Sequence, residues 1–213
     1  MEEMKNFMKN LTLYQIQRLL SDNKITQPID EFVGLRAAVS IVLRMKAGST
    51  EILFIVRALR EGDPWSGQIA FPGGHSEPQD QSMRETAERE TTEETGIDLK
   101  KVATYLGEIE PIKATPRKTG KELKVYPFVY LLDDPDPLID LNCEVSDIIW
   151  GSLGDMYRGD SQTEHIFEID GKEQCFPGYD LGLQVVWGLT YRMIHILFET
   201  VDPDWQFSSA KTN

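Results

Sequence analysis

The sequence predicts a single domain of the α/β (α+β) class. Three observations support this prediction: the chain has 213 residues, it contains β-branched apolar runs of strand length, and a charged helical segment with its own start and stop signals lies between them. Hydrophobic residues make up 40% of the chain and charged residues 27%, which is enough apolar material for one sizeable core. No internal repeat or long linker divides the sequence. We therefore expect a helical extension over residues 1–30, one domain over residues 31–201 and a flexible tail over residues 202–213.

The first part of the chain predicts helix followed by a β-hairpin. Residues 4–22 place their apolar side chains at helical spacing, which indicates one or two short amphipathic helices. A connection over residues 25–31 leads to two β-branched runs, residues 36–45 and 52–58. The small and polar residues between the two runs are typical of a turn, so the runs are expected to pair as a hairpin.

Start and stop signals mark a helix over residues 82–95. Ser82 and Glu85 form the capping-box pattern, and Gly96 stands where a C-cap glycine is expected. Further along the chain, β-branched and aromatic runs predict strands, and an apolar segment over residues 183–200 predicts a last helix. The predicted strands cover residues 102–110, 122–132, 145–150, 165–169 and 173–176.

Charge and cysteine content exclude several classes of protein. There are 22 Lys and Arg residues against 35 Asp and Glu, a net charge of −13, and such a surface repels a nucleic-acid backbone. Cys143 and Cys175 lie far apart without a metal-binding motif, and we expect both to be packed thiols. No signal-peptide pattern begins the sequence, and its most apolar stretch is interrupted by Arg192 and His195. We expect a cytoplasmic protein with neither a nucleic-acid nor a membrane partner.

A cluster of carboxylates on the predicted helix indicates chemistry. Glu93 and Glu94 follow Glu90 by three and four positions, so the three side chains share one face of the helix. Like charges at this spacing are unfavourable unless a cation neutralises them, and Mg²⁺ prefers such oxygen ligands. Arg89 can hold a carboxylate in position, with Glu85 and Glu93 each four residues away. The alternative is a solvated helix face, but the segment has too little apolar surface to be anchored as an ordinary surface helix.

The same segment resembles the box of the Nudix hydrolase superfamily, G-x5-E-x7-R-E-U-x-E-E-x-G-U, in which U is apolar. Arg89, Glu90, Glu93, Glu94, Gly96 and Ile97 match its second half. Residues 52–74 are similar to the additional signature of the coenzyme A pyrophosphatase branch. Two departures stand out: fourteen residues instead of thirteen separate Gly74 from Arg89, and Gln81 occupies the position of the first box glutamate. Glu77, Asp80 or Glu85 are the candidates to replace that glutamate.

The resemblance implies a Nudix-type α/β/α sandwich with a mixed β-sheet and metal-dependent hydrolysis of a pyrophosphate bond. The implied substrate is a nucleoside diphosphate linked to another moiety, first of all coenzyme A or its derivatives, which would be cleaved to 3′,5′-ADP and 4′-phosphopantetheine. Mg²⁺ or Mn²⁺ would bind to Glu90, Glu93 and Glu94 with Gly74, and Arg89 would belong to the catalytic group. Glu93 or Glu94 is expected to be the general base, and Glu144 is a third candidate.

Further residues are expected to contact the substrate, by resemblance or by charge. Lys118 belongs to a basic run over residues 113–124, which is either a solvated loop or a contact to an additional phosphate. The candidates for substrate binding are Arg57, Arg60, Gln68, Phe71, Gly73 and Lys118.

Two other functions remain open at this point. One is a pyrophosphatase for ADP-ribose, nucleotide sugars or dinucleotides, and the other is a catalytically silent module that senses a nucleotide. In each case the expected partner is a small nucleoside diphosphate derivative, and dimerisation is common in the superfamily, which leaves a homodimer open.

Overall fold

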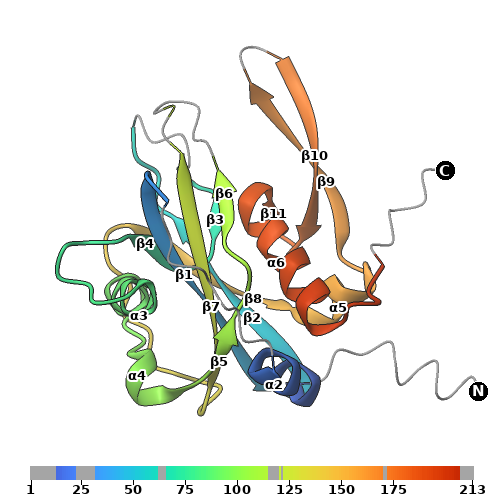
Figure 1. The fold of residues 1–213 in the computed structure, drawn as a ribbon. Coiled ribbons are helices and arrows are strands. Elements are labelled where there is room, and N and C mark those ends of the chain that lie inside the picture. Colours follow the sequence, from blue (N-terminus) through green and yellow to red (C-terminus); the bar gives the residue numbers. More distant parts are fainter. Residues whose placement is uncertain are drawn as a thin grey trace, which may run out of the picture.

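A mixed β-sheet with helices on both faces forms the centre of the molecule (Figure 1). The computed structural model describes residues 13–22, 32–61, 66–114, 120, 122–169 and 172–206. Strands of the sheet follow the order β3-β2-β1-β7-β5, with β4 paired to β1, β6 to β7 and β8 to β2. These strands are β1 (Leu35–Lys46), β2 (Ser49–Arg57), β3 (Ile69–Ala70), β4 (Gly73–His75), β5 (Ala103–Glu108), β6 (Ile112–Ala114), β7 (Leu123–Leu132) and β8 (Val145–Ser152).

One parallel pair makes the sheet mixed. Strand β1 runs parallel to β7 from Leu35↔Leu123 to Leu43↔Leu131, while the other pairs in the sheet are antiparallel. The predicted hairpin is confirmed: β1 and β2 pair directly across a turn at Ala47 and Gly48, whose φ angles are +49° and +81°. Positive φ at both central residues gives the turn the twist that a tight hairpin requires.

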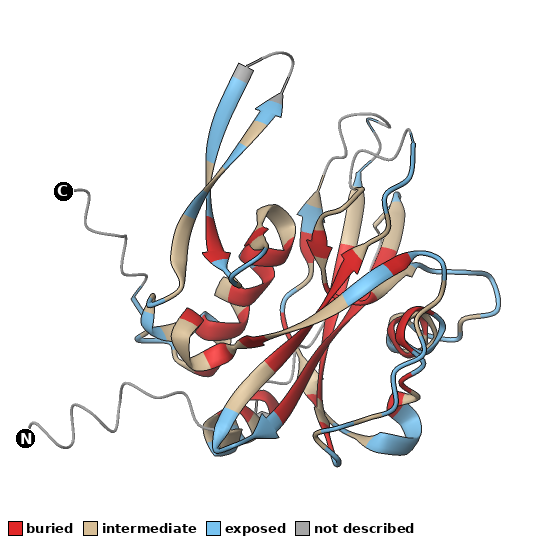
Figure 2. Ribbon diagram, turned by 180° about the vertical axis from the view of Figure 1, so that it is seen from behind, coloured by how far each residue is buried: buried red, intermediate tan, exposed pale blue. Residues whose placement is uncertain are grey.

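Alternation along β1 separates two apolar layers. Ile41 and Leu43 face a core shared with helices α2 (Leu13–Asp22) and α6 (Gly188–Val201), whereas Ala38 and Val42 face a smaller core beneath helix α3 (Met83–Thr95). Buried residues therefore follow the central strands, α6 and the inner side of α3 (Figure 2). This arrangement confirms the expected sandwich, in which α3 lies on one face of the sheet and α6 on the other.

Polar contacts and caps hold α3 in place. The Ser82 hydroxyl accepts a hydrogen bond from the Glu85 amide at 3.1 Å, and Gly96 ends the helix with φ +76°, so both predicted caps are confirmed. The buried Ser40 hydroxyl of β1 donates to the Ala87 carbonyl at 3.1 Å and lies 2.8 Å from the Thr91 hydroxyl. A helix with few apolar residues is thus anchored by hydrogen bonds from its inner face to the sheet.

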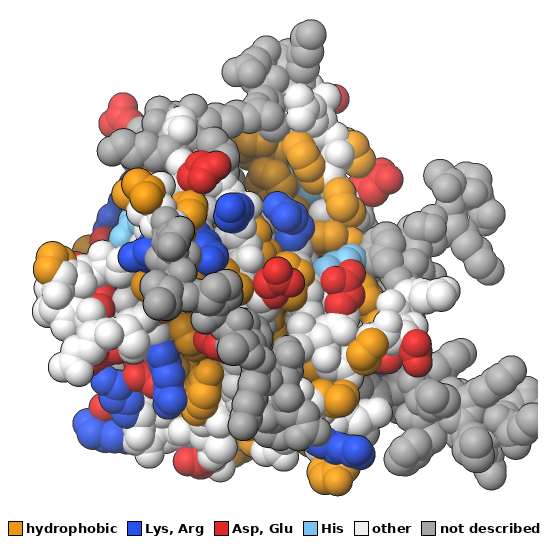
Figure 3. Space-filling model, viewed as in Figure 1, with side chains coloured by type: hydrophobic (Ala, Val, Ile, Leu, Met, Phe, Trp, Pro, Cys, Tyr) orange, Lys and Arg blue, Asp and Glu red, His pale blue; other side chains and the backbone are white. Residues whose placement is uncertain are grey.

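A second sheet stands beside the first and carries a cluster of aromatic rings. It consists of β9 (Gln162–Ile169), β10 (Lys172–Asp180) and β11 (Val185–Trp187). The Trp187 ring lies 4.7 Å from that of His165 and 4.8 Å from that of Phe167. Hydrophobic side chains are visible beside this β9–β10 hairpin in the space-filling view (Figure 3).

Several elements differ from the prediction. The last helix begins at Gly188 instead of residue 183, because β11 occupies the preceding residues and Gly188 has a φ of +64°. The prediction also lacked α4 (Leu99–Val102), α5 (Leu153–Arg158) and the three-residue strands β4 and β6. Trp205, in the segment predicted to be a tail, donates its indole N–H to the Tyr157 carbonyl at 3.0 Å.

Helices within the described ranges are all too short or too polar to cross a membrane. Residues 1–12 and 23–31, which cover most of the predicted N-terminal extension, lie outside the described residues.

Candidate active site

Two carboxylates of α3 lie directly against the glycine pair of β4. The Gly73 amide donates to Glu94 Oε2 at 2.8 Å, and a Cβ atom placed on Gly74 would lie 2.5 Å from the carboxyl group of Glu90. Gly73 has a φ of +154°, and a Cβ there would lie 2.2 Å from the Ala38 carbonyl oxygen. Glycine is therefore required at Gly73, where a Cβ would meet the backbone of β1, whereas a Cβ at Gly74 would displace the flexible end of Glu90.

Burial differs sharply among the three glutamates. Glu94 is 3% exposed, Glu90 is partly buried and the side chain of Glu93 is 55% exposed. Burial raises the pKa of Glu94 to about 8, against the Gly73 hydrogen bond, and the nearby charge of Glu90 raises it further. Burial likewise raises the pKa of Glu90, although Arg89 opposes this. Burial of two neighbouring carboxylates favours the uptake of a proton or the binding of a cation.

Arg89 connects the helix to the loop that precedes it. Its guanidinium binds both carboxylate oxygens of Asp80, with Nε–Oδ1 at 3.0 Å and a terminal nitrogen 3.1 Å from Oδ2. The other terminal nitrogen lies 3.0 Å from Glu90 and 3.2 Å from Glu93. Hydrogen bonding to Arg89 lowers the pKa of Asp80 to about 2. Arg89 therefore keeps Asp80 ionised and holds two carboxylates of the cluster.

Glu77, Asp80 and Glu85 were the candidates to replace the first box glutamate, and of these Asp80 binds Arg89 through both of its oxygens. Glu85 instead accepts a hydrogen bond at 2.8 Å from the amide of Gln81, the residue before the N-cap Ser82. The contact between Glu85 and Arg89 that their spacing suggested is replaced by the bidentate pair with Asp80.

The donor set fits a hard divalent cation. Carboxylate and backbone oxygens are the ligands that Mg²⁺ and Mn²⁺ prefer, and Glu90 and Glu94 bring two carboxylates to the backbone of the glycine pair. As they stand, no three His, Cys, Asp or Glu side chains in the described part of the chain are grouped so that they could hold a metal ion. Glu93 turns to Arg89 instead of joining Glu90 and Glu94.

Two arginines and a further glutamate lie on the Glu94 side of this cluster. Arg57, at the end of β2, and Glu144, just before β8, both act electrostatically on the Glu94 carboxyl, with opposite effects on its pKa. Arg60 binds Glu144 at 3.1 Å. The Gln68 carbonyl accepts from the Arg57 amide at 3.0 Å, which closes the loop after β2. Arg57 and Glu144 therefore lie close enough to Glu94 to act on its charge, and Arg60 is linked to this end of the cluster through Glu144.

Three predictions require correction or cannot be placed. Phe71 is 2% exposed and stacks on Phe54 with ring centroids 5.3 Å apart, so it belongs to the core and cannot stack on a substrate. Cys143 and Cys175 are both exposed, since one lies in a loop and the other on the outer face of the β9–β10 hairpin. Lys118 lies outside the described residues.

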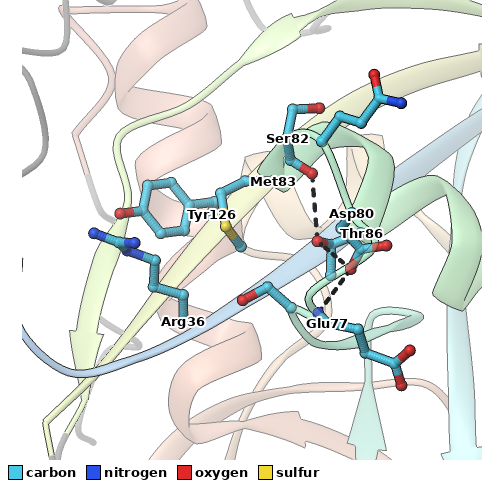
Figure 4. A pocket seen from close by; sticks show the side chains of 9 residues that line it. Arg36, Glu77, Asp80, Ser82, Met83, Thr86 and Tyr126 are labelled. Carbon is cyan, nitrogen blue, oxygen red and sulfur yellow. Dashed lines mark hydrogen bonds between the residues drawn. The ribbon is translucent and has the colours of Figure 1, made fainter.

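A pocket beside the start of α3 was missed at the sequence level. It measures about 400 Å³, and its lining includes Arg36 from β1, Tyr126 from β7 and Met83 from α3 (Figure 4). No local motif connects these residues, because three separate elements supply them. The sequence offered one signal for this pocket: Arg36 is a basic residue directly before the apolar run of a predicted strand.

Comparisons with known proteins give a consistent family assignment. A family model described as NUDIX domain matches residues 34–168. An uncharacterized protein of Schizosaccharomyces pombe, C14C4.10c, is 36% identical over 161 residues, which cover 75% of this chain and 48% of that protein. Mouse mitochondrial coenzyme A diphosphatase NUDT8 is 28% identical over 174 residues, 78% of either chain. The uncharacterized Nudix hydrolase NudL of Photorhabdus laumondii is 34% identical over 138 residues, 64% of this chain and 70% of that one.

Solved structures agree with the fold. A MutT/nudix family protein from Enterococcus faecalis superposes with a TM-score of 0.50 at 14% identity, covering 93% of this chain and 72% of that one. A bifunctional NMN adenylyltransferase/ADP ribose pyrophosphatase from Francisella tularensis, complexed with AMP and a manganese ion, gives 0.53 at 19% identity, covering 88% and 46%. At these identities the likeness concerns the architecture alone.

Proposed function

Because this chain belongs to the Nudix family and is a pyrophosphohydrolase of that family, we propose that its substrate is coenzyme A or an acyl derivative. Hydrolysis of the diphosphate bridge would release 3′,5′-ADP and 4′-phosphopantetheine or its acyl form. The observation that carries the reaction is the contact of two carboxylates, the buried Glu94 and the partly buried Glu90, with Gly73 and Gly74. The choice of substrate is supported by the likeness to the mouse coenzyme A diphosphatase over 78% of both chains.

We propose that Glu90, Glu93 and Glu94, together with the backbone at Gly74, hold Mg²⁺ or Mn²⁺. Nudix enzymes generally use divalent metals, and the charge of this carboxylate cluster supports the same requirement here. A bound divalent ion neutralises the diphosphate and makes the attacking water more acidic. Glu93 would have to leave Arg89 to join the other two carboxylates, and its exposed position permits that rotation.

The side chains of the protein supply orientation and proton transfer. Arg89 keeps the Glu90 carboxylate in place through their 3.0 Å contact. A carboxylate accepts the proton of the attacking water, and Glu93 or Glu94 is our first candidate, with Glu144 the third. On the Glu94 side, Arg57 and Arg60 would bind the phosphate oxygens, because guanidinium groups match their geometry.

The test is hydrolysis of a substrate panel with Mg²⁺ and with Mn²⁺, followed by product identification. We expect coenzyme A to yield 3′,5′-ADP, and we expect Glu93→Gln and Glu94→Gln to lower kcat at least roughly a hundredfold, as removal of a base or metal ligand does. Glu144→Gln is measured beside them, and its effect assigns or excludes the third candidate. Glu173→Gln is the matched control, because Glu173 is exposed on the β9–β10 hairpin.

Other results would point to a different function. Faster cleavage of ADP-ribose, a nucleotide sugar or a dinucleotide than of coenzyme A would change the assigned substrate but leave the assigned active site as it is. Normal rates in both the Glu93 and the Glu94 variant would refute the assigned roles. Nucleotide binding without turnover of any substrate would indicate a sensing module.

A further inference from the structure

The pocket beside the start of α3 adjoins the carboxylate cluster. Arg36 stands two residues before Ala38, and Ala38 pairs with Gly74, against which Glu90 rests. Two residues of a β-strand span about 7 Å. The Ser76 amide donates to the Arg36 carbonyl at 3.0 Å, which fixes the loop after β4 beside β1. A ligand whose diphosphate lay at Glu90 and Gly74 could therefore reach this pocket with its next substituent.

The Arg36 end of the pocket carries positive charge. Figure 4 shows the Arg36 guanidinium pointing toward the Tyr126 ring, with Met83 beyond that ring. Of the two acidic side chains in the lining, Asp80 is bound by Arg89, and Glu77 points away from Arg36 and Tyr126 (Figure 4). Within the described lining, neither acidic side chain is therefore directed at the Arg36 guanidinium.

The chemistry of this lining suits a phosphate group attached to an organic scaffold. A guanidinium carries its hydrogen-bond donors in a planar fork that matches phosphate oxygens. The Ser76 and Ser82 hydroxyls add polar groups to the wall, while Met83 and Tyr126 give it an apolar side for a sugar or base. A free inorganic anion would use the guanidinium group but not the apolar side of the pocket.

We propose that this pocket binds a phosphomonoester on the nucleoside half of the substrate, with Arg36 as its main contact. In coenzyme A this group is the ribose 3′-phosphate, which the ribose separates from the diphosphate. The assignment of that group rests on the proposed function, and the binding experiment below is independent of turnover.

Binding of product-like nucleotides tests the pocket directly. Calorimetry on the full chain compares adenosine 3′,5′-bisphosphate, AMP and inorganic phosphate. We expect the bisphosphate to bind at least about tenfold more tightly than AMP, as one charge-assisted contact predicts, and Arg36→Met to abolish the difference. Equal binding of the bisphosphate and AMP, or equally tight binding of inorganic phosphate, would overturn the proposal.

Kinetics then separates recognition from a structural role of Arg36, which also donates to the Phe32 carbonyl at 3.0 Å. Arg36→Met should lower kcat/KM for coenzyme A by about 10- to 100-fold, mainly through KM, and for dephospho-coenzyme A less than about threefold. Arg36→Lys should restore part of the loss. Lys101→Met removes one positive charge at an exposed site in α4 and should change neither substrate. Equal losses for both substrates would show that Arg36 acts only through the fold.

The proposal can still be tested if Arg36→Met does not fold or if coenzyme A is not cleaved. Where Arg36→Met fails to fold, Ser76→Ala carries the same comparison, and an unchanged preference for the 3′-phosphate in both Ser76→Ala and Arg36→Lys would overturn the proposal. Preference for the bisphosphate that depends on Arg36 would support the pocket even if coenzyme A were not cleaved, and only the proposed function would then fail.

Discussion

At the scale of single residues, the site depends on two glycines, which have no side chain, as much as on its glutamates. Gly73 and Gly74 bring the backbone within reach of Glu94 and Glu90, and a methyl group at either position would meet an atom at 2.5 Å or less. The nucleus of the site therefore consists of two glutamates and two glycines in contact, drawn from elements that only the fold brings together.

Gly74→Ala tests this contact. Its Cβ would meet the Glu90 carboxylate, the end of a flexible side chain, so we expect Glu90 to be displaced and kcat to fall about a hundredfold, with little change in Tm. The control is Gly48→Ala in the hairpin turn, where φ is +81° and no atom lies within 4 Å. That variant should lose about 1 kcal/mol of stability but keep its activity. Equal activity in the two variants would show that Glu90 does not need its present position.

At the scale of elements, the sequence predicted those with strong local signals. The β1–β2 hairpin and helix α3 carry their own turn and cap residues, and the structure agrees with both. Strands β4, β6 and β11 have three residues each, too few for a periodic pattern, and exist because a longer strand pairs with them. The sequence left Asp80 as one of three candidates, and only the structure shows its pair with Arg89; the burial of Phe71 depends on its packing against Phe54, in a different strand.

Helix α6 contains a histidine that should make stability depend on pH. Burial lowers the pKa of His195 to about 4. Its ring lies 4.2 Å from that of Tyr191, at a tilt of 40°, and its Nε2 lies 3.0 Å from the Tyr179 hydroxyl. The unfolded chain takes up a proton below about pH 6.5, but the folded chain does so only near pH 4. The contribution is therefore complete above pH 6.5 and falls as the pH drops toward 4.

Urea unfolding at pH 7 and pH 5 measures this contribution. With allowance for partial exposure, we expect the wild type to lose about 1 kcal/mol more than His195→Gln over this range. Parallel losses in the two proteins would mean that His195 is protonated equally in the folded and unfolded states.

At the scale of the whole molecule, two apolar layers meet at one sheet, and the C-terminal segment closes the larger layer. The Trp205 ring lies 5.1 Å from that of Phe198 and 5.0 Å from that of His195. The predicted boundary at residue 202 therefore separates Trp205 from the helix on which it packs. The predicted N-terminal extension, the cytoplasmic location and a homodimer stay predictions.

Two truncations locate the end of the folded unit. Removal of residues 207–213 should leave Tm within about one degree, whereas removal of residues 202–213 also deletes Trp205 and should cost about 2 kcal/mol of stability, as loss of a large partly buried aromatic does. Calorimetric unfolding of the two shortened chains measures the difference. Equal stability of both would restore the boundary at residue 202.

The parallel pairing of β1 with β7 has a consequence for how the chain becomes active during synthesis. Leu35 and Leu123 are neighbours in the sheet, and α3, with all three clustered glutamates, lies between them in the chain. A ribosome releases the helix well before it releases the strand that completes the surface beneath it. Contacts so distant in sequence form late because the intervening loop must first close. Helix α3 can therefore contact β1 and β4 first, whereas the smaller apolar core beneath it should stay incomplete until Tyr126, Phe128 and Tyr130 of β7 emerge.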